Sequence, residues 1–363
     1  MAEYAPRADG PVIARTGDAG FFVEILRAWR DGQAVVPIEK NATAPVFKMP
    51  VPAGACLVKY TAGAAGVPRG IWFGETAVAA DAERIVSAMG LRREVPALGV
   101  VSLAHSYGFG NVVLPLLLHG VPVVLATAPF PGIVDEAFQN AGGEMTVAAV
   151  PPMWRAWLRS GILPDLPIAL AVSAGSPLTL DLEVMAYSTA GLKIHNFYGA
   201  SECGAIAWDA TGVPRTDGRD VGTPMPGVLV SSGENGRLLV ESDATGCGYD
   251  EERPDDTLAN SRYLTRDIGV VSADGRVLLQ STSGGAINVA GRKVSPAKVE
   301  HAIFSTGLVK RVKVCGFPSV DPERHEEISA TIQLIDGATL AGLRSRVVDL
   351  LPLWEVPRRW QQE

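Results

Sequence analysis

Residues 192–208 read LKIHNFYGASECGAIAW and carry the strongest structural signal in the chain. An apolar run of strand character leads into Tyr198, Gly199, Ser201 and Glu202, and a second apolar segment follows. Nucleotides bind at such strand ends in α/β folds. The tyrosine ring can stack on a base, the glycine lets backbone approach a ligand, and the glutamate offers the oxygen ligands that Mg²⁺ prefers. The alternative interpretation is a glycine turn with a solvated glutamate.

Apolar strand candidates alternate with helical patterns before residue 208, which is typical of parallel α/β sheets. The strand candidates are residues 34–38, 56–60, 98–103, 121–125, 145–150, 168–173 and 193–197. Helical spacing is found in residues 75–89, 133–140 and 180–190, and in a segment from Phe21 to Trp29 that Asp18 can cap and Gly32 can end.

The pattern of apolar and polar residues changes after Trp208. Residues 213–280 contain short alternating runs, which predict a small antiparallel subdomain. Residues 281–291 are rich in glycine and serine and predict a flexible junction. A helix, two strands and a second helix are expected after it. We therefore expect a large domain over residues 1–280, a hinge over 281–291 and a small α+β domain over 292–363.

Composition limits the classes of function. The chain has 363 residues, 47% of them hydrophobic, a net charge of −7 and no run of Lys or Arg, which argues against nucleic acid as a partner. Four cysteines without CxxC spacing predict neither zinc nor disulfides, so a cytoplasmic protein is expected. Cys203 reads as a small buried residue rather than a nucleophile. The start of the chain has no signal-peptide pattern, and prolines and glycine interrupt the apolar residues 111–130, so no membrane span is expected.

The motif at residues 198–202 resembles the Tyr-Gly-x-[Ser/Thr]-Glu motif of the adenylate-forming superfamily, which includes acyl- and aryl-CoA synthetases, non-ribosomal adenylation domains and luciferases. Other matches follow in the family's order. They are residues 60–70 (YTAGAAGVPRG, a phosphate loop), 102–105 (SLAH), 150–152, 173–178 (SAGSPL), 221–224, 263–267 (YLTRD) and 291–300. The resemblance covers nearly the whole chain from about Phe21, and it implies the family's α/β fold with a mobile C-terminal domain.

The resemblance also implies a set of site residues. Asp267 matches the aspartate that accepts both ribose hydroxyls, and His105 matches an acyl-pocket histidine. Glu202 is implied as the Mg²⁺ ligand and, with Ser201, as a catalytic residue. The remaining implied contacts are Thr61, Gly63, Gly66, Arg69, Gly175, Tyr198 and Gly199 for the nucleotide and Ala174 for the acid. The alternative interpretation of His105 is a structural histidine, and that of Asp267 is a turn residue.

Several departures from the family pattern affect positions that take part in the family's reaction. Ala62, Ala64 and Ala65 replace hydroxyl residues of the phosphate loop, and Arg69 replaces a lysine. The family's hinge motif falls on residues 281–288, where its arginine is replaced by threonine. The family's C-terminal lysine contacts the acid and the α-phosphate, and the sequence after residue 358 offers none at that place. We expect a member shortened at both ends and partly degenerate.

The implied function is ATP-dependent activation of a carboxylic acid as an acyl-adenylate, with Mg²⁺, followed by transfer to the thiol of CoA or a carrier protein. His105 favours an acyl or aryl acid over an amino acid. The alternative is a degenerate relative that binds a nucleotide, acyl-adenylate or acyl-thioester without efficient adenylation. A third hypothesis is a partial catalyst that uses a preformed adenylate. The acid, the thiol acceptor and a possible homo-oligomer stay open.

Overall fold

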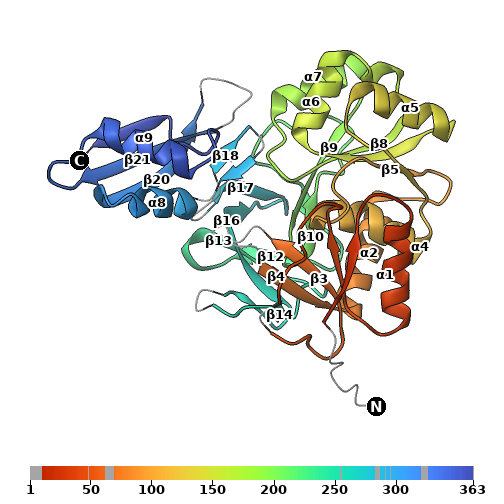
Figure 1. Ribbon diagram of the computed structural model, residues 1–363. Coiled ribbons are helices and arrows are strands. Elements are labelled where there is room, and N and C mark those ends of the chain that lie inside the picture. Colours follow the sequence, from red (N-terminus) through yellow and green to blue (C-terminus); the bar gives the residue numbers. More distant parts are fainter. Residues whose placement is uncertain are drawn as a thin grey trace. The chain divides into compact units, whose positions relative to one another are not determined.

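The computed structural model describes residues 10–47, 49–61, 69–253, 256–282, 287–290, 292–294, 296–319 and 326–362 (Figure 1). The described residues form two compact units. The first ends at Gln280 and the second begins at Ser281.

A seven-stranded sheet is the centre of the first unit. Its order is β11-β10-β9-β8-β7-β5-β6, and its strands from β5 to β9 are parallel. Their bounds are β5 (Ala97–Gly99), β6 (Val123–Leu125), β7 (Met145–Ala149), β8 (Ile168–Ser173), β9 (Ile194–Ala200), β10 (Gly204–Trp208) and β11 (Thr223–Pro224). The helices α5 (Pro131–Ala141), α6 (Pro151–Ser160) and α7 (Leu180–Ala190) pack on one face over an apolar core that includes Trp154 and Trp157 (Figure 1).

A five-stranded sheet lies beside it, in the order β1-β2-β3-β4-β14. Its strands are β1 (Val12–Arg15), β2 (Val35–Ile38), β3 (Ala55–Thr61), β4 (Arg69–Gly74) and β14 (Gly248–Tyr249). The helix α2 (Glu75–Met89) contacts β3, β4 and β10, so it joins the two sheets. The other helices of this region are α1 (Gly20–Arg30), α3 (Ser106–Gly108), the π-helical η1 (Phe109–Val113) and α4 (Leu114–His119). Among the described residues, no helix is long and apolar enough to cross a membrane.

The strand expected over residues 98–103 is too long. The chain leaves the sheet after Gly99 and turns into α3, and a Cβ on Gly108 would lie only 2.1 Å from the carbonyl oxygen of Ser102. Residues such as Val101 and Leu103 are buried there without strand pairing, which explains the misleading apolar run.

A third sheet completes the first unit. It contains β12 (Leu229–Ser232), β13 (Arg237–Glu241), β15 (Leu258–Ala259), β16 (Arg262–Val271) and β17 (Val277–Thr282). Short 3₁₀ turns occupy Leu163–Asp165 and Glu234–Gly236. The long strand β16 matters most, because it carries Asp267.

The second unit has its own apolar core, which includes Ile303, Ala330 and Leu343. Its elements are β18 (Ile287–Val289), β19 (Arg292–Val294), α8 (Pro296–Ser305), β20 (Val309–Pro318), β21 (Glu326–Leu334), α9 (Leu340–Leu350) and β22 (Arg359–Gln362). The expected junction over 281–291 is only partly described. Residues 287–289 of it form β18, while 283–286 and 291 lie outside the described residues.

Candidate functional site

The turn after β9 is built from two glycines that accept no side chain. A Cβ on Gly199 would lie 2.7 Å from the carbonyl oxygen of Gly204. Gly204 itself has a φ of +67°, and a Cβ there would lie 2.3 Å from Oδ1 of Asp81. Only glycine tolerates both the close approach and the positive φ. This tight turn holds Ser201 and Glu202 at the carboxyl end of β9.

Behind the turn lies a buried ion pair that the sequence did not indicate. The Lys59 ammonium lies 3.6 Å from the Asp81 carboxylate, and both side chains are buried. Asp81 also accepts a hydrogen bond of 2.9 Å from the backbone N–H of Ala205. The pair therefore fixes the start of β10 to α2 and β3, and with it the turn that carries Glu202.

Tyr198 and Asp267 lie together. The Tyr198 hydroxyl donates a hydrogen bond of 2.7 Å to Oδ2 of Asp267, and the ring is only 8% exposed. The backbone N–H of Asp267 is bonded to the Thr265 hydroxyl at 3.2 Å. The buried ring is thus part of the core, and its clearest effect is to orient the Asp267 carboxylate. A carboxylate can accept several hydrogen bonds at once.

Glu202 lies among aromatic hydroxyls. The Tyr249 hydroxyl donates to Oε1 of Glu202 at 3.4 Å. Burial raises the pKa of Glu202, although a hydrogen bond from Tyr263 and the nearby charge of Arg266 oppose the shift. Among the described residues, no three His, Cys, Asp or Glu side chains are grouped to hold a metal. A single carboxylate such as Glu202 can hold a Mg²⁺ ion only where water or phosphate oxygens complete its coordination.

The loop before α3 connects His105 to the strand-end turn. His105 is exposed at the start of α3, and its backbone N–H donates to the Ser102 hydroxyl at 3.3 Å. The Ser102 hydroxyl in turn donates to Glu39 after β2. The next residue, Ser106, donates a hydrogen bond of 2.9 Å to the Ser201 hydroxyl. Glu39 and Ser106 were missed, because nothing local in the sequence marks a partner this distant.

Ala174 and Gly175 follow β8, the strand next to β9. Ala174 is buried, whereas Gly175 is exposed with a φ of +83°. Since β8 and β9 are parallel, these two residues lie at the same edge of the sheet as Tyr198. Phe197 lies beneath this edge against Tyr107, with ring centroids 5.9 Å apart.

Two of the predicted phosphate-loop contacts, Gly63 and Gly66, lie outside the described residues. Thr61 and Arg69 pair across the β3–β4 hairpin that flanks them. The Arg69 guanidinium binds both carboxylate oxygens of Asp256, at 2.7 and 2.5 Å, and lies 3.7 Å from the ring centroid of Tyr249. The charge expected to meet phosphate is thus neutralised by an internal carboxylate.

Cys203 is fully buried, as the sequence indicated. Burial raises the pKa of its thiol well above the ordinary value, and the carboxylates of Glu202 and Asp81 act in the same direction. A buried, protonated thiol is a poor nucleophile.

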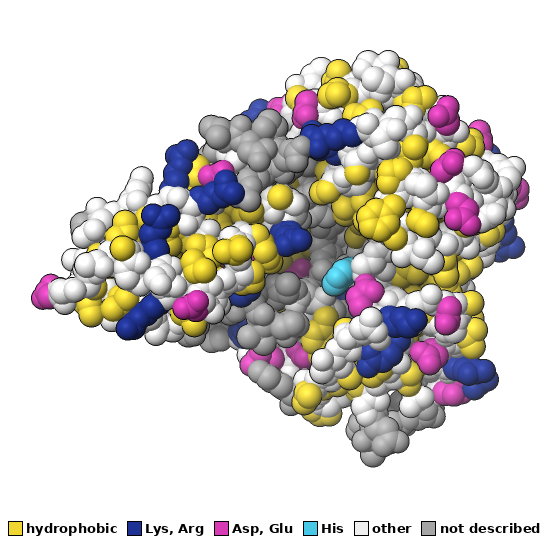
Figure 2. All heavy atoms as spheres, turned by 45° about the horizontal axis from the view of Figure 1, so that its top comes forward, with side chains coloured by type: hydrophobic (Ala, Val, Ile, Leu, Met, Phe, Trp, Pro, Cys, Tyr) yellow, Lys and Arg dark blue, Asp and Glu magenta, His cyan; other side chains and the backbone are white. Residues whose placement is uncertain are grey.

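On the face drawn in Figure 2, the described Lys and Arg side chains are interspersed with Asp and Glu rather than gathered into one basic band.

The family model of the AMP-binding enzymes matches residues 19–248, well over half of the chain. The protein therefore belongs to the AMP-binding enzyme family, and the predicted membership of the adenylate-forming superfamily is confirmed.

Two curated relatives are similar over most of the chain. A feruloyl-CoA synthase from Amycolatopsis sp is 29% identical over 309 residues, which are 79% of this chain and 61% of that protein. An anthranilate–CoA ligase from Pseudomonas aeruginosa is 27% identical over 82% of this chain and 60% of its own length. The chain thus spans about 60% of the length of these two relatives.

Solved structures share the fold. An amide bond synthetase mutant from Marinactinospora thermotolerans matches 99% of this chain and 87% of its own, with a TM-score of 0.76 and 22% identity. A malonyl-CoA ligase matches 97% of this chain and 89% of its own, with a TM-score of 0.72 and 20% identity. The predicted fold, α/β sheets with a β-rich subdomain and a small α+β domain, is confirmed.

Proposed function

We propose that this protein is an acid–thiol ligase of the acyl- or aryl-CoA synthetase type, which activates a carboxylic acid as its acyl-adenylate. The observation that carries the proposal is the meeting of Tyr198, Ser201, Glu202 and Asp267 at one strand end. Family membership supports adenylate chemistry, and the names of the two curated relatives favour an aromatic acid. ATP would supply the adenylyl group and pyrophosphate as the leaving group.

Each side chain has a distinct part in this proposal. Asp267, oriented by Tyr198, accepts hydrogen bonds from the ribose diol, because a carboxylate is a suitable bidentate acceptor. Ser201, joined to Ser106, can donate to an α-phosphate oxygen. Glu202 would hold Mg²⁺, which stabilises charge developing on phosphorus. His105 and Ala174 would line the acid's position at the same sheet edge, and Gly175 would lie against the nucleotide.

The thiol acceptor would be CoA or a carrier protein. Thr61, Gly63, Gly66 and Arg69 would face the pyrophosphate part of ATP, where glycine-rich backbone can cradle phosphates.

A second function is favoured by one contact. Arg69 is bound on both sides by Asp256 and Tyr249, so its charge is not presented to a triphosphate. Such a protein would bind AMP or an acyl-adenylate well and ATP with little further gain. It would use a preformed adenylate or act as a binding protein.

ATP–pyrophosphate exchange separates the two functions. We expect exchange when Mg²⁺ is present with an aryl acid from a panel of ferulate, anthranilate and benzoate, and none with leucine as the amino-acid control. Glu202→Gln should reduce it by about a hundredfold, the scale of one electrostatic contribution. Absence of exchange with every acid, together with retained AMP binding, would contradict the ligase and support the binder.

A further inference from the structure

A cavity of about 510 Å³ opens in the first unit, away from the strand-end site. None of the residues assigned above to nucleotide, acid or metal lines it. Its walls come from the end of α1, the start of β3, the first turns of α2, and α4. This volume lies within the range of small-molecule sites, which are mostly apolar with a few placed polar groups.

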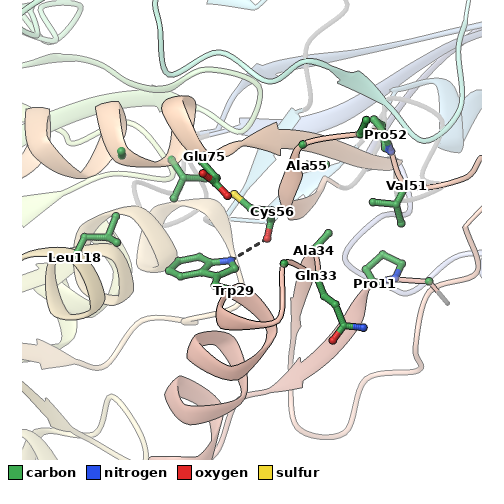
Figure 3. Close-up of a pocket in the computed structure, with 16 residues that line it drawn as sticks. Pro11, Trp29, Gln33, Ala34, Val51, Pro52, Ala55, Cys56, Glu75 and Leu118 are labelled. Carbon is green, nitrogen blue, oxygen red and sulfur yellow. Dashed lines mark hydrogen bonds between the residues drawn. The ribbon is translucent and has the colours of Figure 1, made fainter. Parts of the chain in front are cut away.

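The walls have that composition. Apolar contact is offered by Trp29, Val78 and Leu118, among others. The indole N–H of Trp29 donates a hydrogen bond of 2.9 Å to the backbone carbonyl of Cys56, which fixes the ring in the wall (Figure 3).

Glu75 gives the cavity its charge. Among the described lining residues it is the only charged one; its side chain is exposed in the first turn of α2 and makes no hydrogen bond or ion pair with another described residue. Figure 3 places its carboxylate beside Cys56, near the indole of Trp29. Burial and the Glu75 charge raise the pKa of the Cys56 thiol to about 12, so the thiol stays neutral and adds no second negative charge.

We propose that this cavity binds a small organic monocation, an ammonium group on an aromatic or aliphatic body. The Glu75 carboxylate meets the ammonium, and the apolar walls, with Trp29 among them, take the body. The same carboxylate disfavours an organic anion. The inference is independent of the proposed ligase function, because the two sites share no residue.

Titration calorimetry with 2-phenylethylamine at pH 7 tests the proposal. We expect saturable binding to the full chain, and about threefold weaker binding to Glu75→Gln, the scale of an ion pair at an exposed side chain. Glu136→Gln removes an exposed carboxylate on α5 and should bind like the unmodified protein. The neutral probe 2-phenylethanol should bind more weakly than the amine, and equally to Glu75→Gln and the unmodified protein.

Ala79→Phe places a ring in the cavity from an exposed position of α2 and should abolish amine binding. Thermal unfolding of each variant reports whether it is folded. If Ala79→Phe does not fold, amine binding to Glu75→Gln and binding of 2-phenylethanol still test the proposal. The proposal is wrong if the amine does not bind, if Glu75→Gln binds it unchanged, if Glu136→Gln weakens it equally, or if the alcohol binds as tightly.

Discussion

Tyr198 and Asp267 are separated by 69 positions in the sequence and joined by one hydrogen bond of 2.7 Å. Through this bond a core aromatic residue orients the carboxylate that we propose binds the ribose. Side-chain hydrogen bonds of this kind restrict the orientation of the acceptor and lower the cost of ordering it when ligand binds.

Tyr198→Phe isolates that contribution, because it removes the hydroxyl and keeps the buried ring. We expect AMP affinity to fall by about 0.5–1.5 kcal/mol, the usual net value of one hydrogen bond. Calorimetry measures the change. Tyr187→Phe, on an exposed tyrosine of α7, is the matched control and should bind AMP normally. Equal affinities of Tyr198→Phe and the unmodified protein would show that Asp267 needs no orientation by this residue.

Glu202 predicts a pH dependence of stability. Burial raises its pKa in the folded chain above that in the unfolded chain. The unfolded chain therefore releases the proton first as pH rises, and stability is lost as pH rises through the folded pKa. Glu202→Gln cannot titrate, so it should gain in stability over the unmodified protein from acid to neutral pH. Urea unfolding of both proteins at several pH values without Mg²⁺ measures the difference in their free energies of unfolding. A difference that does not change with pH would contradict the prediction.

Among the elements, α7, β9 and β10 are joined by a buried ionic network. Lys193 contacts Glu183 on α7 and lies 2.7 Å from the Asp209 carboxylate, which follows β10. Arg215 lies 2.9 Å from Glu183, and Arg276 lies 3.0 Å from Asp209. Buried charges of this kind are stable only when all partners are present. The network therefore fixes the strand whose far end carries the site.

Lys193→Met should lower the free energy of unfolding by about 3–5 kcal/mol, because it leaves two buried carboxylates short of a partner. The matched control is Arg219→Met, which breaks an exposed pair with Asp217 and should cost less than about 1 kcal/mol. Urea unfolding compares them. Similar losses in the two variants would mean that the network adds no more than a surface pair.

Sequence patterns predicted several elements of the first unit well. Residues 75–89, 168–173 and 180–190 were predicted with the bounds the structure has. The strand over 98–103 failed because apolar residues can be buried in a loop as well as in a sheet. At the site, the local motif of residues 198–202 was visible, whereas Asp81, Glu39 and Asp256 were not. Their contacts depend on how distant elements pack, which no local pattern records.

At the scale of the whole molecule, the first unit brings three sheets and their connections to one strand end. The same packing brings Asp256 onto Arg69, and this pair bears on which nucleotide the protein prefers. A guanidinium that is already paired with an internal carboxylate attracts a phosphate less strongly, because the carboxylate offsets its positive charge. The pair therefore predicts a small difference between ATP and AMP affinity.

Asp256→Asn should raise the affinity for Mg-ATP several-fold more than that for AMP, because it returns a full positive charge to Arg69. AMP affinity is the internal measure that the site is still folded. Asp217→Asn breaks an exposed arginine pair and should leave the ratio of the two affinities unchanged. An unchanged ratio in Asp256→Asn would show that Arg69 does not meet the phosphates.

We propose that Asp267, at the strand end with Tyr198 and Glu202, forms the nucleotide site. Calorimetric titration of AMP into the full chain and its Asp267→Asn variant tests this most directly, with Asp274→Asn as a control on an exposed aspartate nearby. We predict that AMP binds the unmodified protein and Asp274→Asn alike, and binds Asp267→Asn about 1.5–3 kcal/mol more weakly, the value of hydrogen bonds to a charged group. Equal affinity in all three proteins would contradict the claim.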